Sequence, residues 1–463
     1  MPLLIQNGDI ITGDSRRTAD ILCEGETIVR IAPGIAPPPG AEVIDASGCF
    51  VFPGFLDPHV HIHLPFMGTV AKDTWASASR AALMGGTTTL IEMICPARTD
   101  DALAAFEQWL ANAAGHSACD FTFHMGVTRW DAATEAQLRE IVRRGITSFK
   151  VFLAYKGAFG VDDTELYRTL KLAADLGVTV TAHCENETLI AERQAELLAA
   201  GLTDSAQHHE SRPPQVEAEG VHHFLTFAEL TGARAYIVHL SCAEALREAL
   251  AARARGVRVS IETLIQYLTL DHTYTERPDG AKFVMSPPLR DVRNQDLLWQ
   301  ALRDGHIQTV ATDHAPFDFA GQKDMGRHDF TKIPNGIPSL EERIKLLYTH
   351  GVCTGRIDLH TFVRIASTSA AEIFGLAPRK GDIRPGADAD LVIWDPQHRS
   401  TISAATHHMQ VDYSAFEGWP VAGRARDVTV RGTVAVRDGK YCGTAGRGRF
   451  LARQPQEPWP LSA

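Results

Sequence analysis

Short apolar runs alternate with longer amphipathic segments through the middle of the chain. Each run has the length of a buried strand, and the segments that follow repeat apolar residues at helical spacing, as at 163–177, 242–256 and 295–305. The runs lie at 51–57, 87–93, 120–127, 148–155, 179–185, 235–241, 258–263 and 309–315. Eight buried strands that alternate with helices predict a (β/α)8, TIM-like barrel, whose functional side chains belong at the carboxyl ends of its strands.

The two ends of the chain have a different texture, with short strands separated by turns rich in glycine, asparagine and aspartate. This pattern occupies residues 1–52 and returns at 376–445, so we expect one small β-sandwich domain built from both ends. The barrel would then be inserted as residues 53–375. Residues 446–463 are rich in proline and form a predicted C-terminal tail.

Composition and charge narrow the class of protein. The chain has 463 residues, a formal charge of −11 and no run of Lys or Arg, which argues against nucleic acid as the partner. No apolar stretch is long and uncharged enough to predict a membrane span. The eight cysteines include no CxxC pair, and the first residues do not resemble a secretion signal, so we expect free thiols and a cytoplasmic protein.

Residue types that bind metal ions occur near the ends of five of the predicted strands. His59 and His61 are two apart on the first strand, so both imidazoles can face one ion. Lys150 lies inside an otherwise apolar strand, where a lone ammonium is costly; a salt bridge or an extended side chain is the ordinary explanation for such a lysine. The remaining candidates are His183, His239 and Asp313, at the ends of the fifth, sixth and eighth strands. Each has an ordinary structural explanation by itself, but all six together at one end of a barrel indicate a metal site.

Several longer motifs give the chain a resemblance to a known family. They include DPHVHIHLPF at 57–66, SFKVFLAYK at 148–156, AHCEN at 182–186, GAKFVMSPPLR at 280–290 and DFTKIPNG at 329–336. With these motifs the chain resembles the cyclic amidohydrolases of the amidohydrolase superfamily, and among them the D-hydantoinase and dihydropyrimidinase group. The resemblance runs over nearly the full length.

The resemblance implies a role for each candidate residue. His59, His61 and Asp313 would bind one divalent ion, and His183 and His239 a second. Lys150, carboxylated on its amine, would bridge the two ions. Zinc suits these ligands best, and manganese or cobalt could occupy the same site. The reaction implied is hydrolysis of the cyclic amide of 5-substituted hydantoins or 5,6-dihydropyrimidines to N-carbamoyl amino acids, with a hydroxide shared by the ions as nucleophile.

The resemblance also implies the groups that handle the substrate. Tyr155 would donate a hydrogen bond to the developing oxyanion, and Asp313 would move a proton from the hydroxide to the leaving nitrogen. Ser286 and Asn335 would hold the amide edge of the ring, largely through main-chain groups. An apolar wall for the ring substituent is expected from Leu64, Phe66, Met67, Phe152 and Phe159. The group forms dimers and tetramers, so a homo-oligomer is expected, with the tail as a possible contact.

Two other functions remain open from the sequence. An allantoinase-like cyclic amidase would share the metal ligands, whereas dihydroorotase would need an arginine beside the HxH pair that residues 57–66 lack. A non-catalytic scaffold protein of the same fold would have lost ligands, and this chain keeps all six. His63 is a departure from the group, because related sequences usually have Asp, Gln or Asn there. Its imidazole could bend toward the first metal ion or the substrate entrance, but we expect it in the loop or behind the metal ligands.

Overall fold

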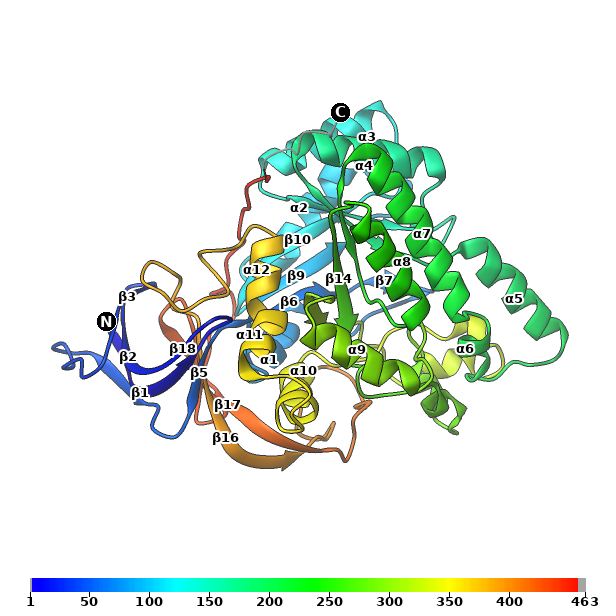
Figure 1. Cartoon of the computed structure of the whole chain (residues 1–463). Coiled ribbons are helices and arrows are strands. Elements are labelled where there is room, and N and C mark those ends of the chain that lie inside the picture. The colour runs from blue at the N-terminus through cyan, green and yellow to red at the C-terminus, as the bar shows by residue number, and fades with distance from the viewer. Residues whose placement is uncertain (1, 457–463) are drawn as a thin grey trace.

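Eight parallel strands form the centre of the molecule, and helices surround them (Figure 1). The computed structural model describes residues 2–456. In spatial order the strands are β6 (Phe55–Val60), β9 (Thr87–Ile94), β10 (Asp120–Gly126), β11 (Ser148–Phe152), β12 (Thr179–His183), β13 (Arg234–Ile237), β14 (Val259–Leu264) and β15 (Thr309–Ala311). The barrel predicted from the alternation of apolar runs and helices is therefore confirmed.

Each helix returns the chain from the end of one strand to the start of the next. These helices are α1 (Trp75–Met84), α2 (Ala102–Ala113), α3 (Ala132–Arg143), α4 (Asp163–Leu176), α7 (Pro214–Thr231), α8 (Ala243–Ala254) and α9 (Arg293–Arg303). Helix α4 is an example of how the sequence determines where a helix begins and ends. Asp162 caps its first turn by accepting a hydrogen bond from the amide of Glu165 at 2.8 Å. The helix ends at Gly177, whose φ of 68° suits a residue without a side chain.

Further helices lie in the connections after β12 and β15. Helices α5 (Glu187–Ala199) and α6 (Gln207–Glu210) belong to the long connection after β12, and α5 lies at the far edge of the barrel in Figure 1. Helices α10 (Arg343–Leu347), α11 (Leu359–Val363) and α12 (Ser369–Ile373) follow β15. The short turns are η1 (His272–Glu276), η2 (Gly280–Phe283), η3 (Lys323–Gly326), η4 (Phe330–Lys332), η5 (Tyr348–Val352) and η6 (Arg364–Thr368).

The barrel closes between its first and last strands by two different contacts. At the carboxyl end, the amide of His61 donates to the carbonyl of His314 at 2.8 Å. Toward the other end, the buried guanidinium of Arg343 donates to the carbonyls of Leu56 and Val310 at 2.9 and 2.8 Å, one on each strand. Arg343 thus satisfies one buried backbone carbonyl on each of the two strands.

The two ends of the chain meet in a second, nine-stranded sheet. It contains β1 (Leu3–Ile11), β2 (Arg16–Glu24), β3 (Thr27–Ala32), β4 (Glu42–Asp45), β5 (Phe50–Pro53), β16 (Leu391–Thr401), β17 (Pro420–Val430), β18 (Thr433–Arg437) and β19 (Lys440–Tyr441). Strands β5 and β16 pair antiparallel and join the two halves. The expected β module from both chain ends is confirmed, whereas the exact domain boundaries at residues 52/53, 375/376 and 445/446 stay predictions.

The last described residues run along the amino-terminal end of the barrel. The amide of Arg453 donates to Gly145 at 2.9 Å, and the amide of Gln456 donates to Gly177 at 3.0 Å, just before β11 and β12. The guanidinium of Arg453 is buried and donates to Ser148 Oγ at 3.0 Å. Residues 446–456 therefore contact their own barrel. The rest of the predicted tail, 457–463, lies outside the described residues, and its contact with another subunit stays a prediction.

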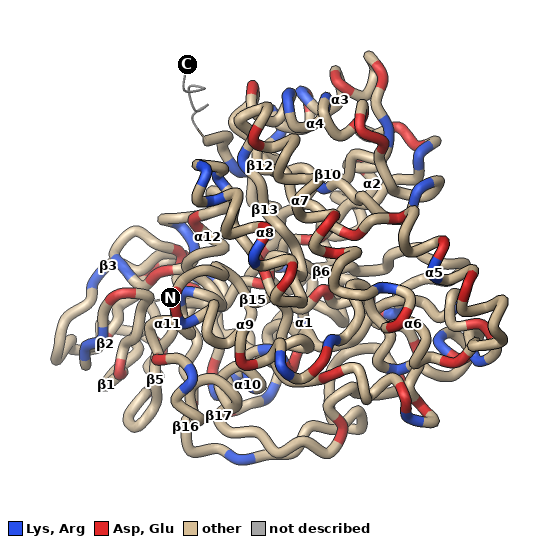
Figure 2. The backbone as a smooth tube through the Cα atoms, turned by 45° about the vertical axis from the view of Figure 1, so that its right-hand side comes forward, with Lys and Arg blue, Asp and Glu red and all other residues tan. Residues whose placement is uncertain are grey.

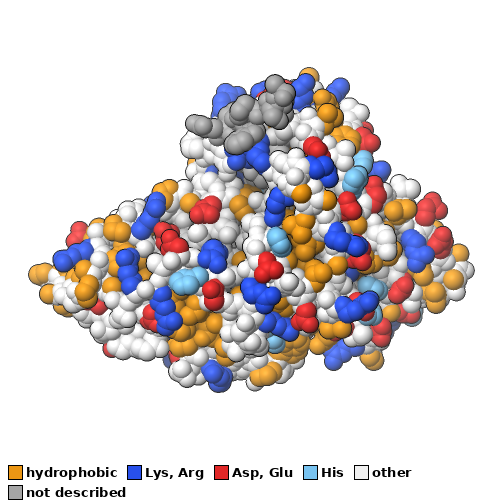
Figure 3. All heavy atoms as spheres, viewed as in Figure 1, with side chains coloured by type: hydrophobic (Ala, Val, Ile, Leu, Met, Phe, Trp, Pro, Cys, Tyr) orange, Lys and Arg blue, Asp and Glu red, His pale blue; other side chains and the backbone are white. Residues whose placement is uncertain are grey.

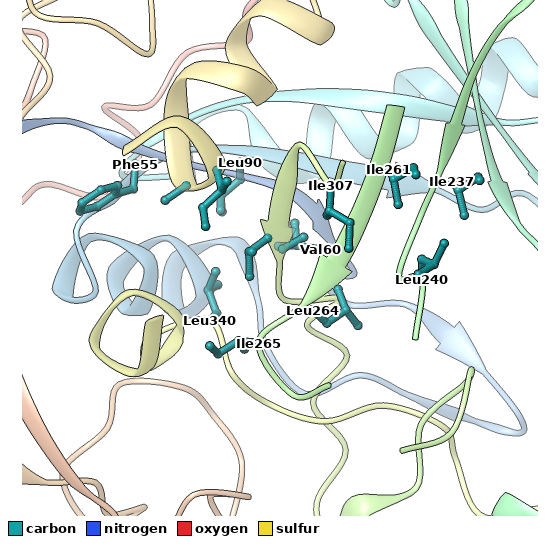
Figure 4. Close-up of a cluster of buried hydrophobic side chains, with 14 of the residues drawn as sticks. Phe55, Val60, Leu90, Ile237, Leu240, Ile261, Leu264, Ile265, Ile307 and Leu340 are labelled. Carbon is teal, nitrogen blue, oxygen red and sulfur yellow. The ribbon is translucent and has the colours of Figure 1, made fainter. Parts of the chain in front are cut away.

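The core of the barrel consists of aliphatic and aromatic side chains from every strand. Figure 4 shows part of it, where Val60, Leu90, Ile237 and Ile261 come from four different strands. All eight residues of β9 are buried, as a strand covered on both faces requires.

The surface carries charges of both signs. Acidic and basic residues are interspersed over the backbone in Figure 2, and Figure 3 shows the same mixture over one face of the molecule. Within residues 2–456, no helix combines the length and apolar character needed to cross a membrane.

Candidate metal centre and substrate pocket

All six predicted metal ligands line one cavity at the carboxyl end of the barrel. His59 lies in β6, Lys150 in β11 and His183 at the end of β12, while the other three follow their strands within two residues. The cavity holds about 510 Å³ of space free of protein atoms, part of it open to solvent. The parallel strands bring together residues that are more than 250 positions apart in the sequence.

Three donor atoms converge on one side of this cavity. Nε2 of His59 and Nε2 of His61 each lie 3.1 Å from Oδ1 of Asp313. The ligand atoms of these residues all lie within 4.8 Å of one another, which suits a single ion. Burial holds the pKa of His59 well below its usual range, so its imidazole is neutral and can offer a lone pair. Burial favours a raised pKa for Asp313, but the electrostatic interaction with His59 and the hydrogen bond from His61 bring that pKa below its ordinary value.

A second pair of histidines lies on the other side. Nδ1 of His183 is 3.0 Å from Nε2 of His239, and Nε2 of His183 is 2.8 Å from the carboxylate of Glu185. With Nε2 engaged by Glu185, Nδ1 is the nitrogen of His183 left to bind an ion. Burial also lowers the pKa of His239 well below its usual value, which keeps this imidazole neutral.

Lys150 lies between these groups and is fully buried. Its Nζ has no hydrogen-bonding partner among residues 2–456, and burial lowers its pKa to about 8. A lysine with a lowered pKa has an appreciable fraction of neutral amine, the form that reacts with CO2. The other five candidate ligands offer imidazole nitrogen and carboxylate oxygen atoms, and they form two groups near Lys150. This donor set fits two divalent cations with an acidic bridging group at Lys150.

The three residues expected to hold the ring lie together at the mouth of the cavity. Nδ2 of Asn335 donates to Oγ of Ser286 at 3.0 Å and lies 3.5 Å from the hydroxyl of Tyr155. The backbone of Tyr155 is left-handed, with φ of 62°, and its amide donates to Glu187 Oε2 at 2.6 Å. Such a conformation is costly for a bulky residue, and that hydrogen bond helps to hold it.

An aromatic wall faces these polar groups. The rings of Phe66 and Phe159 are stacked with centroids 6.1 Å apart, and Phe152 lies 5.6 Å from Phe159. Leu64 lines the same cavity, whereas Met67 lines an adjoining pocket next to Tyr155. The predicted wall is therefore assembled except for Met67.

His63 lies away from the metal ligands. Its side chain is exposed on the loop after β6, with a left-handed φ of 55°. It lines a different pocket, beside Trp75 and Trp109 of helices α1 and α2. The structure thus places His63 in the loop and outside the cavity that holds the candidate ligands.

A carboxylate that the sequence pattern did not reveal, Glu262, contacts both halves of the site. Oε1 of the buried Glu262 accepts hydrogen bonds from His59 Nδ1 at 2.8 Å and from the amide of His239 at 3.0 Å. Its Oε2 accepts from the hydroxyl of Tyr236 at 2.8 Å. This arrangement fixes the tautomer of His59, with the proton on Nδ1 and the lone pair on Nε2. The only signal in the sequence was one acidic residue inside a predicted apolar strand.

A second missed group supports His183. Glu185, which holds that imidazole, forms a buried salt bridge of 2.6 Å with Arg212. The guanidinium of Arg212 also lies 5.8 Å from the centre of the Tyr155 ring. Burial favours a raised pKa for Glu185, but the charge of Arg212 and the hydrogen bond from His183 hold that pKa near 2. Glu185 therefore stays ionised and orients His183.

Comparisons with known proteins agree with this arrangement. Residues 50–435 match the amidohydrolase family. A D-hydantoinase of Geobacillus stearothermophilus is 46% identical over 98% of this chain and 97% of its own. The crystal structure of a D-hydantoinase (dihydropyrimidinase) from a Thermus species is 59% identical with a TM-score of 0.96, covering 98% of this chain and 99% of that one. A dihydropyrimidinase from Brevibacillus agri is 43% identical with a TM-score of 0.97, covering 98% and 99%. By its sequence, its fold and the residues around its cavity, the chain belongs to the amidohydrolase family.

Proposed function

We propose that the protein hydrolyses the cyclic amide bond of 5-substituted hydantoins and 5,6-dihydropyrimidines, giving N-carbamoyl amino acids. The observation that carries the proposal is that one cavity brings together the six candidate ligands and an aromatic wall. Among these ligands, Nζ of Lys150 has no hydrogen-bonding partner within residues 2–456. The names of the full-length relatives support the same class of substrate.

Each group has a chemical task in this reaction. Two divalent ions held by the six ligands, with a carboxylated Lys150 as bridge, would lower the pKa of a water molecule and polarise the ring carbonyl. The hydroxyl of Tyr155 donates a hydrogen bond to the carbonyl oxygen as negative charge develops on it. Asp313 accepts the proton that the attacking water loses and returns it to the ring nitrogen as the C–N bond breaks. The net change is addition of one water molecule.

The aromatic wall favours an uncharged substituent on the ring. Leu64, Phe66, Phe152 and Phe159 present apolar surface, and none of them can neutralise a carboxylate. The allantoinase-like alternative would need polar partners for a ureido substituent on this side. A non-catalytic scaffold protein would have lost metal ligands, whereas all six candidate ligands are kept here and line one cavity.

Three further properties belong to the same proposal. Zinc is proposed as the metal because imidazole and carboxylate ligands suit it, with manganese or cobalt as substitutes. A homodimer or homotetramer is proposed from the resemblance to the group. A cytoplasmic location is proposed because all eight cysteines are free, six of them buried.

The test is ring opening of dihydrouracil and of 5-phenylhydantoin by purified protein supplied with zinc and bicarbonate. Lys150→Ala is measured beside Lys171→Ala, which removes an exposed lysine from α4. We expect turnover and about two bound metal ions in the parent and control proteins, and loss of both with Lys150→Ala. Metal binding without opening of either ring would contradict the proposed substrate class, and allantoin would then be the next substrate to measure. Absence of metal binding in the parent protein would contradict a hydrolase.

A further inference from the structure

One short segment connects the groups on opposite sides of the substrate pocket. This bridging segment, residues 318–326, follows β15 and includes η3 (Lys323–Gly326). It supplies no side chain to the lining of the cavity that holds the candidate metal ligands. Its hydrogen bonds instead go to the loops that carry the substrate-binding residues.

Lys323 joins the two loops that hold the amide edge of the ring. Its side chain is fully buried, and Nζ donates to the carbonyls of Val284 and Pro334, both at 2.9 Å. Val284 is two residues before Ser286, and Pro334 immediately precedes Asn335. One amino group therefore fixes both members of the pair that we assign to the amide edge.

The environment of Lys323 indicates that these two hydrogen bonds are the reason for its position. No carboxylate forms an ion pair with it within residues 2–456. Burying an amino group without a counter-ion is costly, and an apolar residue of similar length would fill the same volume without that cost. The carbonyl of Val284 also accepts a hydrogen bond from the amide of Gly336 at 3.0 Å, so both of its lone pairs are used.

The neighbouring residue, Gln322, reaches in the other direction. Its Nε2 donates to Thr69 Oγ1 at 2.6 Å and to the carbonyl of Val70 at 2.9 Å. Its Oε1 accepts from the amide of Asp318 at 2.6 Å, so the side chain is held at both ends. Thr69 and Val70 form β8 (Thr69–Val70), which pairs with β7 (Pro65–Phe66), the strand that carries Phe66 of the aromatic wall.

We propose that Gln322 and Lys323 are positioning residues that set the aromatic wall and the amide-edge pair at a fixed separation. Lys323 aligns Ser286 with Asn335, and this alignment matters to every ring because the amide edge is common to all substrates. Gln322 fixes the hairpin that carries Phe66, which matters only to rings with a large substituent. The inference rests on the proposed function and assigns separate consequences to two adjacent residues.

The first experiment measures Lys323→Met, which keeps the length of the side chain and removes its N–H donors. We expect KM for dihydrouracil and for 5-phenylhydantoin to rise about 10- to 100-fold, with a smaller change in kcat and an unchanged metal content. Lys332→Met is the matched control, because that lysine lies on η4 with a side chain 70% exposed and should leave both constants unchanged. Unchanged KM values, or a loss of activity that only follows a loss of folded protein, would overturn the role of Lys323.

The second experiment measures Gln322→Ala with the same two substrates. We expect the ratio of kcat/KM for 5-phenylhydantoin to that for dihydrouracil to fall about tenfold, with dihydrouracil little affected. An equal change for both rings, or none, would overturn the role of Gln322.

Two measurements protect these tests against misfolding and a wrong substrate class. Thermal unfolding and metal analysis accompany each variant. If Lys323→Met does not fold, Lys323→Gln keeps an N–H donor on a shorter chain and should give an intermediate KM; the parent value would overturn the role. If the parent protein opens neither ring, the proposed function itself fails. Turnover by the parent with unaffected variants would contradict only the inference about Gln322 and Lys323.

Discussion

Two lysines buried at opposite ends of the same barrel have opposite electrostatic surroundings. At the amino-terminal end, Lys380 lies 2.6 Å from Asp120, 2.7 Å from Asp390 and 2.9 Å from Asp388. At the carboxyl end, Nζ of Lys150 has no hydrogen-bonding partner among the described residues. At the amino-terminal end, which has a structural role, the charge of the buried lysine is neutralised by the protein's own carboxylates. At the carboxyl end, where we propose that ligands bind, polar groups such as Nζ of Lys150 are left for a ligand to satisfy.

The carboxyl end also holds strained backbone at the site itself, although Arg431, which pairs with Asp120 at the amino-terminal end, has a φ of 45° as well. Tyr155, His239 and Asp313 all have left-handed φ angles, of 62°, 44° and 47°, and all three line the candidate site. Non-glycine residues with positive φ are uncommon and cost free energy that the rest of the fold must supply. Substitutions at the carboxyl end should therefore affect activity more than stability, and substitutions at the amino-terminal end should do the reverse.

The largest effect is expected from Asp313→Asn. Asparagine has nearly the same shape and tolerates the left-handed backbone, but its amide cannot accept a proton in the manner of a carboxylate. We expect kcat for ring opening to fall roughly 10²- to 10⁴-fold. The temperature of unfolding should fall only slightly, because asparagine keeps the shape of the side chain and loses only the electrostatic contacts with His59 and His61 that hold the pKa of Asp313 below its ordinary value. A large loss of stability with activity retained would reverse the comparison between the two ends.

An effect of similar size, on stability instead of activity, is expected from Lys380→Met. Removing the cation leaves Asp120, Asp388 and Asp390 buried beside one another, which costs about 3–5 kcal/mol of unfolding free energy. Denaturant unfolding of the metal-free protein measures this value, and the folded fraction should still bind metal.

The control for this variant is Arg379→Met. That guanidinium also contacts Asp388, at 2.8 Å, but its side chain is 47% exposed, so we expect a loss of less than about 1 kcal/mol. Equal losses for Lys380→Met and Arg379→Met would show that burial of the ion pairs has no special weight at this end of the barrel.

Glu262→Gln should have an intermediate effect, on metal affinity. The variant tests how far the candidate metal ligands depend on the residues that hold them in place. Glutamine keeps the shape of the side chain, but one of its two accepting oxygens becomes an N–H donor. It can therefore no longer accept hydrogen bonds from His59, the His239 amide and Tyr236 all together. We expect metal affinity to fall about 10- to 100-fold, measured by competition with a chelator. Glu92→Gln is the matched control, since this buried acid accepts from the amide of Ile62 at 3.0 Å and contacts no candidate ligand. Equal loss of affinity in both variants would contradict a specific role for Glu262.

The sequence predicted the barrel and its metal-binding residue types because both depend on local pattern. Apolar runs of strand length determine the barrel, and parallel strands bring the residues at their carboxyl ends together without further information. His59, His61 and Lys150 could therefore be selected from their places on two strands. Ser286 and Asn335 could be assigned only through the resemblance to a family, because both lie in irregular loops.

The supporting residues could not be predicted for a different reason. Glu262 is 203 positions from His59, and nothing near either residue indicates the other as its partner. Lys323 makes its contacts through backbone carbonyls, which every residue possesses, so no motif marks them. Residues 446–456 form no regular helix or strand, and they contact the barrel through main-chain hydrogen bonds together with the buried side chain of Arg453.

The smallest effect is expected at the aromatic wall, from Phe66→Ala. The ring of Phe66 contacts Tyr155 and Phe159, with centroids 5.5 and 6.1 Å away, so its loss removes apolar surface without touching a candidate metal ligand. We expect kcat/KM for 5-phenylhydantoin to fall by an amount that corresponds to about 1–3 kcal/mol of lost transition-state binding. The value of kcat/KM for dihydrouracil should change little. Because Gln322 is proposed to act through the hairpin that carries Phe66, adding Gln322→Ala to Phe66→Ala should cause no further loss of selectivity. A fully additive double variant would show that Gln322 affects selectivity by a route other than the aromatic wall.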